Sequence, residues 1–64
     1  MTGPAEDFRQ EFTKVGESLA ATCADMLAEF TKAGDWPSAG IVAEQGDLVG
    51  FVLASLARIA GRLP

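Results

Sequence analysis

The amino-acid sequence predicts an all-α fold in which two long helices form an antiparallel hairpin. Two stretches carry apolar residues at helical spacing, and a short stretch with glycine and proline separates them. The second stretch, from Ile41 to Leu63, is so apolar that one partner helix could not cover it. We therefore expect the hairpin to dimerise into a four-helix bundle or to pack into a larger assembly.

The first helix is expected from about residue 4 to residue 33. Pro4 suits a first turn, and Glu6 and Asp7 then place negative charge at the positive end of the helix dipole. A line of residues at alternating steps of four and three, the spacing of a paired helix, follows along the chain: Phe8, Phe12, Val15, Leu19, Thr22 and Met26.

The linker is expected at residues 34–38. Gly34 can end the first helix in the left-handed conformation that glycine adopts easily. Either Asp35 or Ser38 can cap the second helix, and Pro37 fits the first turn, where no backbone N–H is needed. A connection this short makes the two helices antiparallel neighbours.

The second helix is expected from about residue 39 to residue 62, so that residues 1–64 form a single domain. Its weak point is Gly46, because glycine costs about 1 kcal/mol relative to alanine inside a helix. Asp47 could also cap a new helix at this point. We expect one continuous helix, with a break near Gly46 as the alternative.

The composition removes two common ways of stabilising a small protein. The chain has 64 residues, one cysteine and no histidine, so it lacks an intrachain disulfide and the usual zinc or haem ligands. A core of this size supplies only about 3 to 5 kcal/mol by itself. We therefore expect no metal and no cofactor, and we expect association to stabilise the fold. Cys23 is expected to be a buried structural residue, with a disulfide between subunits as the lesser alternative.

The charge and the chain ends bear on partners and location. A net charge of −4, with only five scattered basic residues, argues against nucleic acid or an anionic membrane as the main partner. The first residues do not follow the pattern of a signal peptide. The uncharged run from Leu48 to Ala57 is much shorter than the roughly 20 residues that cross a bilayer. We expect a cytoplasmic protein.

Small residues form one stripe on each predicted helix, and large apolar residues form another surface. The stripes consist of Gly16, Ala20, Ala24 and Ala28 on the first helix and of Gly46, Gly50, Ala54, Ala57 and Gly61 on the second. We expect the stripes to face each other within the hairpin, because small side chains let backbones approach closely. The alternative is that alanine is simply a good helix former. The surface left for an oligomer interface would then consist of Phe8, Phe12, Val15, Leu19, Met26, Val49, Val52, Leu56 and Ile59.

Phe51 is the candidate anchor for a second protein. It lies on the polar side of the second helix, and the expected rim around it consists of Glu44, Asp47, Arg58 and Arg62. An exposed aromatic residue rimmed by charges is typical of a protein-protein contact. The alternative is that the oligomer or the linker covers it.

The sequence gives little support for catalysis. The acidic pairs Asp7 with Glu11 and Asp25 with Glu29 lie on the charged side of the first helix, where we expect a solvated surface. No nucleophile-base pair or phosphate-binding loop is recognisable. We expect a small acidic interaction protein, an adaptor or regulator that acts as a homo-oligomer, and not an enzyme. The alternatives are an accessory subunit of a larger enzyme or membrane-associated complex and, more weakly, a peripheral membrane protein.

Overall fold

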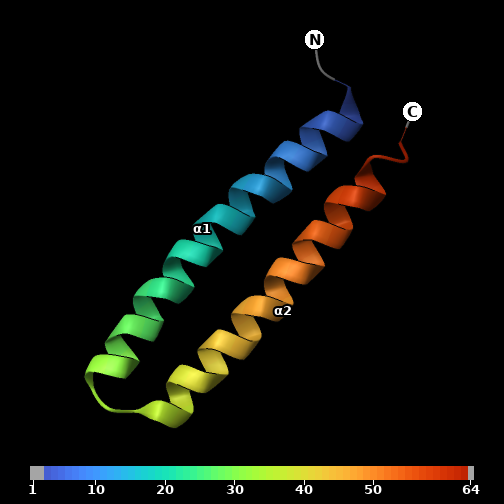
Figure 1. The fold of residues 1–64 in the computed structure, drawn as a ribbon. Coiled ribbons are helices and arrows are strands. Elements are labelled where there is room, and N and C mark those ends of the chain that lie inside the picture. Colours follow the sequence, from blue (N-terminus) through green and yellow to red (C-terminus); the bar gives the residue numbers. More distant parts are fainter. Residues whose placement is uncertain (1–2, 64) are drawn as a thin grey trace.

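Two helices of similar length lie side by side and form an antiparallel hairpin (Figure 1). The computed structural model describes residues 3–63, in which α1 spans Pro4–Lys32 and α2 spans Trp36–Ala60. The Cα atoms extend over 49 × 18 × 6 Å, so the hairpin is a single layer of two helices. The predicted all-α hairpin is confirmed.

The sequence signals at the start of α1 act as expected. Gly3 has extended backbone angles and is the N-cap, and Pro4 follows at the first helical position. The first turn holds Glu6 and Asp7, whose charges complement the helix dipole. The backbone N–H of Asp7 donates to the Gly3 carbonyl at 3.1 Å and closes that turn.

The turn between the helices depends on Gly34. This residue has a φ of +73°, a conformation that residues with a side chain rarely adopt. The Gly34 N–H donates to the Thr31 carbonyl at 3.1 Å, and the Asp35 N–H donates to the Phe30 carbonyl at 2.9 Å. This pair of bonds is a Schellman motif, which satisfies carbonyls at the end of α1. The predicted left-handed end of the first helix is confirmed.

The second helix begins earlier than residue 39, where the sequence placed it. The backbone N–H of Ser38 donates to the Asp35 carboxylate at 3.2 Å, and the Ala39 N–H donates to the Asp35 carbonyl at 3.0 Å. Asp35 is therefore the N-cap, and Trp36 and Pro37 belong to the first turn.

At its other end, α2 stops two residues before the expected residue 62. Ala60 is the last helical residue, and Gly61 is the C-cap. The expectation of a continuous helix is confirmed, because α2 passes through Gly46 without interruption.

The cap of α2 gives the first testable prediction. Hydrogen bonds from Ser38 hold the pKa of the Asp35 carboxyl below its ordinary value, although partial desolvation opposes them. A carboxyl whose pKa is lower in the folded state stabilises the fold above its unfolded pKa of about 4, and this contribution disappears as the pH falls through the folded pKa. Asp35→Asn keeps an oxygen acceptor for the Ser38 N–H but does not titrate. We expect the melting temperature of the wild type to fall more than that of Asp35→Asn between pH 5 and pH 2. Equal pH dependence in the two proteins would show that the cap contributes nothing to acid sensitivity.

Reduced exposure marks the line along which the two helices meet. On α1 this line consists of Ala5, Phe12, Gly16, Cys23, Leu27 and Phe30, and on α2 it consists of Ala39, Val42, Gly46, Leu53, Ala57 and Ala60. Among residues 3–63 only Ala39 and Ala60 are buried, at 5% and 7% exposure. The hairpin contact is therefore long but thin, and it encloses no large side chain.

Two glycines let the helices approach each other. A Cβ atom added at Gly16 would lie 3.6 Å from Cδ1 of Leu53, and one added at Gly46 would lie 3.6 Å from the sulfur of Cys23. Each glycine thus faces a larger side chain on the other helix, and no glycine faces glycine across the contact. The pairs are seven residues apart on both helices, which is the register of an antiparallel helix pair.

Candidate protein interface

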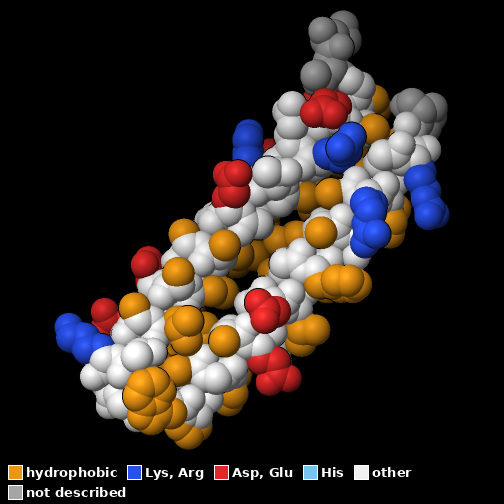
Figure 2. Space-filling view, viewed as in Figure 1, with side chains coloured by type: hydrophobic (Ala, Val, Ile, Leu, Met, Phe, Trp, Pro, Cys, Tyr) orange, Lys and Arg blue, Asp and Glu red, His pale blue; other side chains and the backbone are white. Residues whose placement is uncertain are grey.

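One side of the hairpin is a shallow groove with small side chains on both flanks. Its larger hollow, of about 330 Å³, lies over the middle of the contact line, and a second hollow continues toward the chain ends. The flanks consist of Thr13, Ala20 and Ala24 on α1 and of Ala43, Asp47, Gly50 and Ala54 on α2. We call this side the groove face. Figure 2 shows it, with small apolar side chains (orange) along both helices.

The other side of the hairpin carries the large apolar side chains. On each helix these residues lie across the contact line from the groove flanks, as the turn of 100° per residue requires, and Leu19 and Val49 also reach the larger hollow between the helices. We call this side the apolar face, and it consists of Phe8, Val15, Leu19, Met26, Val49, Val52, Leu56 and Ile59. All eight side chains are exposed in the hairpin, from 38% for Val49 to 55% for Ile59.

The structure brings together eight of the nine residues expected at an oligomer interface. Phe12 is the exception, because it is half-buried against α2 and lines the second hollow beside Leu53 and Ala57. Phe12 therefore belongs to the hairpin contact, and its place in an oligomer interface stays a prediction. The contact residues Ala39, Ala60 and Leu27 were missed, although small residues seven apart on α2 were a usable signal.

The expected pairing of the small-residue stripes is correct for only part of each stripe. Gly16, Gly46 and Ala57 lie on the contact line. In contrast, Ala20, Ala24, Ala28, Gly50 and Ala54 are exposed. A Cβ atom added at Gly50 would meet nothing within 4 Å, so the expected close packing at this residue is wrong. The physical reason is that the contact line takes one residue from each helix turn, and its neighbours in the stripe point into the groove.

This difference predicts opposite effects for the same substitution at two glycines of α2. Gly46→Leu should lower the stability by about 1 to 3 kcal/mol, because Cys23 already occupies the space beyond the first carbon. Gly50→Leu should raise the stability by about 1 kcal/mol, because leucine is the better helix former and the site is open. Thermal unfolding of both variants gives the comparison. If Gly50→Leu instead melts at a lower temperature than the wild type, a second copy or another protein packs closely against Gly50 on the groove face.

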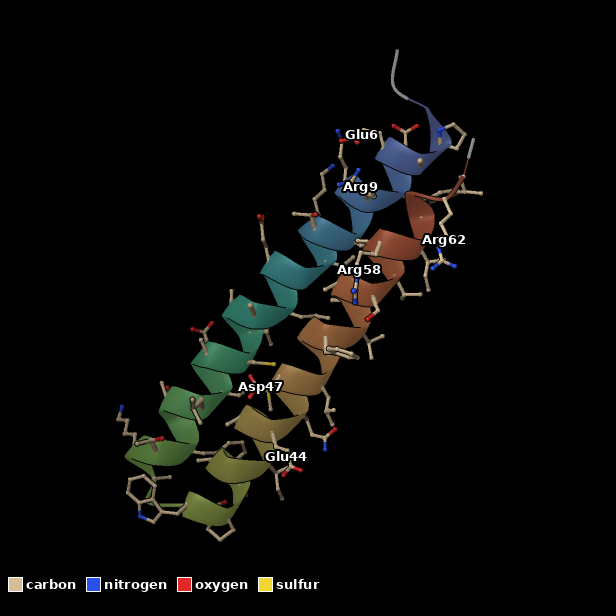
Figure 3. All side chains as sticks on the ribbon, turned by 45° about the vertical axis from the view of Figure 1, so that its right-hand side comes forward. Glu6, Arg9, Glu44, Asp47, Arg58 and Arg62 are labelled. Carbon is tan, nitrogen blue, oxygen red and sulfur yellow. The ribbon has the colours of Figure 1, made fainter. Side chains whose placement is uncertain are left out.

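Phe51 and four charged residues form a strip on α2 that faces away from α1. The steps between Glu44, Asp47, Phe51 and Arg58 are three, four and seven residues, which keep these four on one side of α2, and Arg62 follows four residues later, beyond the C-cap Gly61. Figure 3 shows the two acids toward the turn and the two arginines toward the chain ends. We call these five residues the Phe51 strip.

Phe51 is more exposed than aromatic residues usually are. Phe51 is 68% exposed, more than the other large apolar side chains that the structure describes. Arg58 donates a hydrogen bond to the Ser55 hydroxyl at 3.3 Å, which holds the guanidinium along the helix surface. In the hairpin, neither the linker nor Trp36 covers Phe51, since Trp36 is itself 66% exposed at the start of α2.

The structure also shows the positions of the cysteine and of an acidic pair that the sequence offered as candidate sites. Cys23 is a free, half-buried thiol whose sulfur lies 3.6 Å from the position of a Cβ atom at Gly46, and it also lines the larger hollow. Within residues 3–63, no group of three or more carboxylate or thiol side chains is placed to hold a metal ion. Asp25 and Glu29 are exposed on α1.

The comparisons with known proteins add no identification. No protein family, no curated protein and no solved structure matches this sequence. By length and composition alone, α2 could cross a membrane, and almost none of its apolar stretch is buried in the hairpin. The cytoplasmic location stays a prediction.

Proposed function

We propose that this chain is a small acidic protein-protein interaction module that acts as a homodimer. Two hairpins pack apolar face against apolar face and form a four-helix bundle. The Phe51 strips remain outside and bind a second protein, as in an adaptor or regulator. The observation that carries the proposal is the contrast between eight exposed large side chains on the apolar face and two buried alanines in the hairpin.

The shape of the hairpin supports association. Stable domains contain at least two packed layers of secondary structure, and the hairpin has one, with a Cα thickness of 6 Å. A face of 49 × 18 Å offers about 900 Å², close to the roughly 800 Å² per partner in a standard interface. A second copy supplies both the missing layer and a surface of the same chemistry.

The alternative is an accessory subunit of a larger enzyme or membrane-associated complex. The length and apolar character of α2 favour it. Against full insertion in a bilayer, Glu44 and Asp47 lie near the middle of α2, where each acid would cost about 2.5 to 3.5 kcal/mol. The homodimer keeps both acids in water.

Sedimentation equilibrium of the isolated chain tests the proposal. At micromolar concentration we expect one species of twice the 6.7 kDa chain mass, with a melting temperature that rises with protein concentration. A monomer that melts cooperatively would overturn the homodimer. Polydisperse aggregation would favour the accessory subunit, and co-sedimentation with liposomes would favour the membrane-associated form.

A further inference from the structure

The charges of the hairpin are distributed unequally along its length. The half nearest the turn, residues 19–50, has five acidic residues and one basic residue, a net charge of −4. The half nearest the chain ends, residues 1–18 and 51–64, has four acidic and four basic residues and is neutral. We call these the turn half and the open half. The division follows the structure, since residue 18 is the midpoint of α1.

The same asymmetry is sharpest on α2. Glu44 and Asp47 lie in its turn half, Arg58 lies in its open half, and Arg62 follows just beyond its end (Figure 3). Residues 36–50 therefore carry a net charge of −2, and residues 51–64 carry +2. These side chains are exposed on the outer side of α2, away from the apolar face, so they act on a second copy only over a distance.

If the helices of the two copies stay aligned, symmetry allows two ways for the copies to meet through the apolar face. A twofold axis parallel to the helices brings both turns to the same end of the bundle. A twofold axis perpendicular to the helices, within the plane of the interface, brings the turns to opposite ends. In the second arrangement each helix lies over the same helix of the other copy and runs antiparallel to it.

The charge distribution separates these two arrangements. With the turns together, one end of the bundle carries −8 and the other is neutral, and the acidic halves of both α2 helices lie at one end. With the turns at opposite ends, each end carries −4, and the arginine half of α2 lies over the acidic half of α2 in the second copy. Like charges repel over about a Debye length, which is about 30 Å at an ionic strength of 0.01 M, so the second arrangement has the lower electrostatic energy at low salt.

We propose that a second copy docks on the apolar face with its turn at the opposite end of the bundle. This inference rests on the proposed homodimer and adds its orientation. The charged side chains lie on the outer sides of the bundle, so they are farther apart than the roughly 8 to 10 Å between packed helix axes and than the Debye length of about 8 Å in physiological salt. The preference should therefore be strong at low salt and should decrease as salt is added.

Distances between spin labels measure the orientation directly. The labels are attached to cysteine introduced by Ala33→Cys or Ser18→Cys, each in a Cys23→Ala background. Ala33 lies at the turn and Ser18 at the middle of α1. The 29 residues of α1 span about 44 Å at 1.5 Å per residue. We expect a distance of about 40 Å between the two labels at position 33 and a distance below about 30 Å at position 18.

Each outcome decides a different claim. A short distance at position 33 would overturn the orientation and leave the homodimer standing. The absence of any intermolecular distance at position 18 would overturn the homodimer itself. At an ionic strength of 20 mM we expect the long distance at position 33 to exceed the short one at least ~tenfold, and the ratio should fall at 500 mM.

A charge variant tests the cause of the preference. Arg58→Glu with Arg62→Glu changes the open half from neutral to −4, the same charge as the turn half. Both arrangements then have equal charge distributions, and we expect short and long distances at position 33 in about equal amounts. The label at position 18 reports whether the variant still dimerises. If the long distance remains dominant at position 33, packing sets the orientation and the electrostatic explanation is wrong.

Discussion

Replacement of Val52 or Leu56 by aspartate is expected to dissociate the dimer and unfold the chain. Both side chains belong to the apolar face, where the second copy would enclose them. A buried, unpaired carboxylate costs several kcal/mol, and a chain of this size has only about 3 to 5 kcal/mol of stability to lose. In an isolated hairpin Val52 is 52% exposed, and the same change would alter the stability by at most about 0.5 kcal/mol.

The matched control is Ala54→Asp, because Ala54 lies two residues from Val52 on the groove face of the same helix. We expect this variant to remain a dimer in sedimentation and to keep most of its helical circular dichroism. Loss of the dimer in Ala54→Asp, together with a normal dimer in Val52→Asp, would show that the dimer interface lies on the groove face and not on the apolar face.

The helix limits were predictable because they depend on local chemistry. Gly34 can adopt a positive φ at little cost, and Asp35 has a short carboxylate that reaches the N–H of Ser38. Both effects act within four residues, so they can be recognised without knowledge of the fold. The choice between Asp35 and Ser38 as the cap was open, and the structure shows Asp35 in that place.

The line of contact between the helices was harder to predict because α2 is apolar around much of its circumference. Such a helix can present several different lines to α1, and the hydrophobic pattern does not select one of them. Gly50 and Gly46 look equivalent in the sequence, yet only Gly46 faces a side chain across the contact.

The placement of Phe12 shows the same limit on α1. It shares a regular spacing with Phe8 and Val15, but the contact line crosses this row of residues at Phe12. Phe12 is therefore half-buried, whereas its neighbours in the row are exposed. The rotation of a helix about its axis decides such cases, and it depends on both helices together.

The substitution Phe51→Ala is expected to leave folding nearly unchanged and to weaken the binding of a protein partner. With 68% of its surface exposed and, by helical spacing, its side of α2 turned away from α1, Phe51 contributes little to the hairpin. Alanine is also the better helix former, so the melting temperature should stay the same or rise slightly. A core phenylalanine truncated to alanine would instead cost about 3 to 5 kcal/mol and unfold a domain this small.

Thermal unfolding and sedimentation of Phe51→Ala therefore decide its role before any partner is known. If Phe51→Ala is a folded dimer, partner binding remains as the role of Phe51. For a protein that binds the wild type, we then expect Phe51→Ala to lose at least ~2 kcal/mol of binding free energy, which is about thirtyfold in Kd. The matched control is Arg62→Glu, since Arg62 lies at the rim of the Phe51 strip. Its effect should fall on the association rate and on the salt dependence of binding, because rim charges guide the encounter more than they hold the complex. An unfolded or dissociated Phe51→Ala would place Phe51 in the core of an assembly in which further copies cover the outer side of α2.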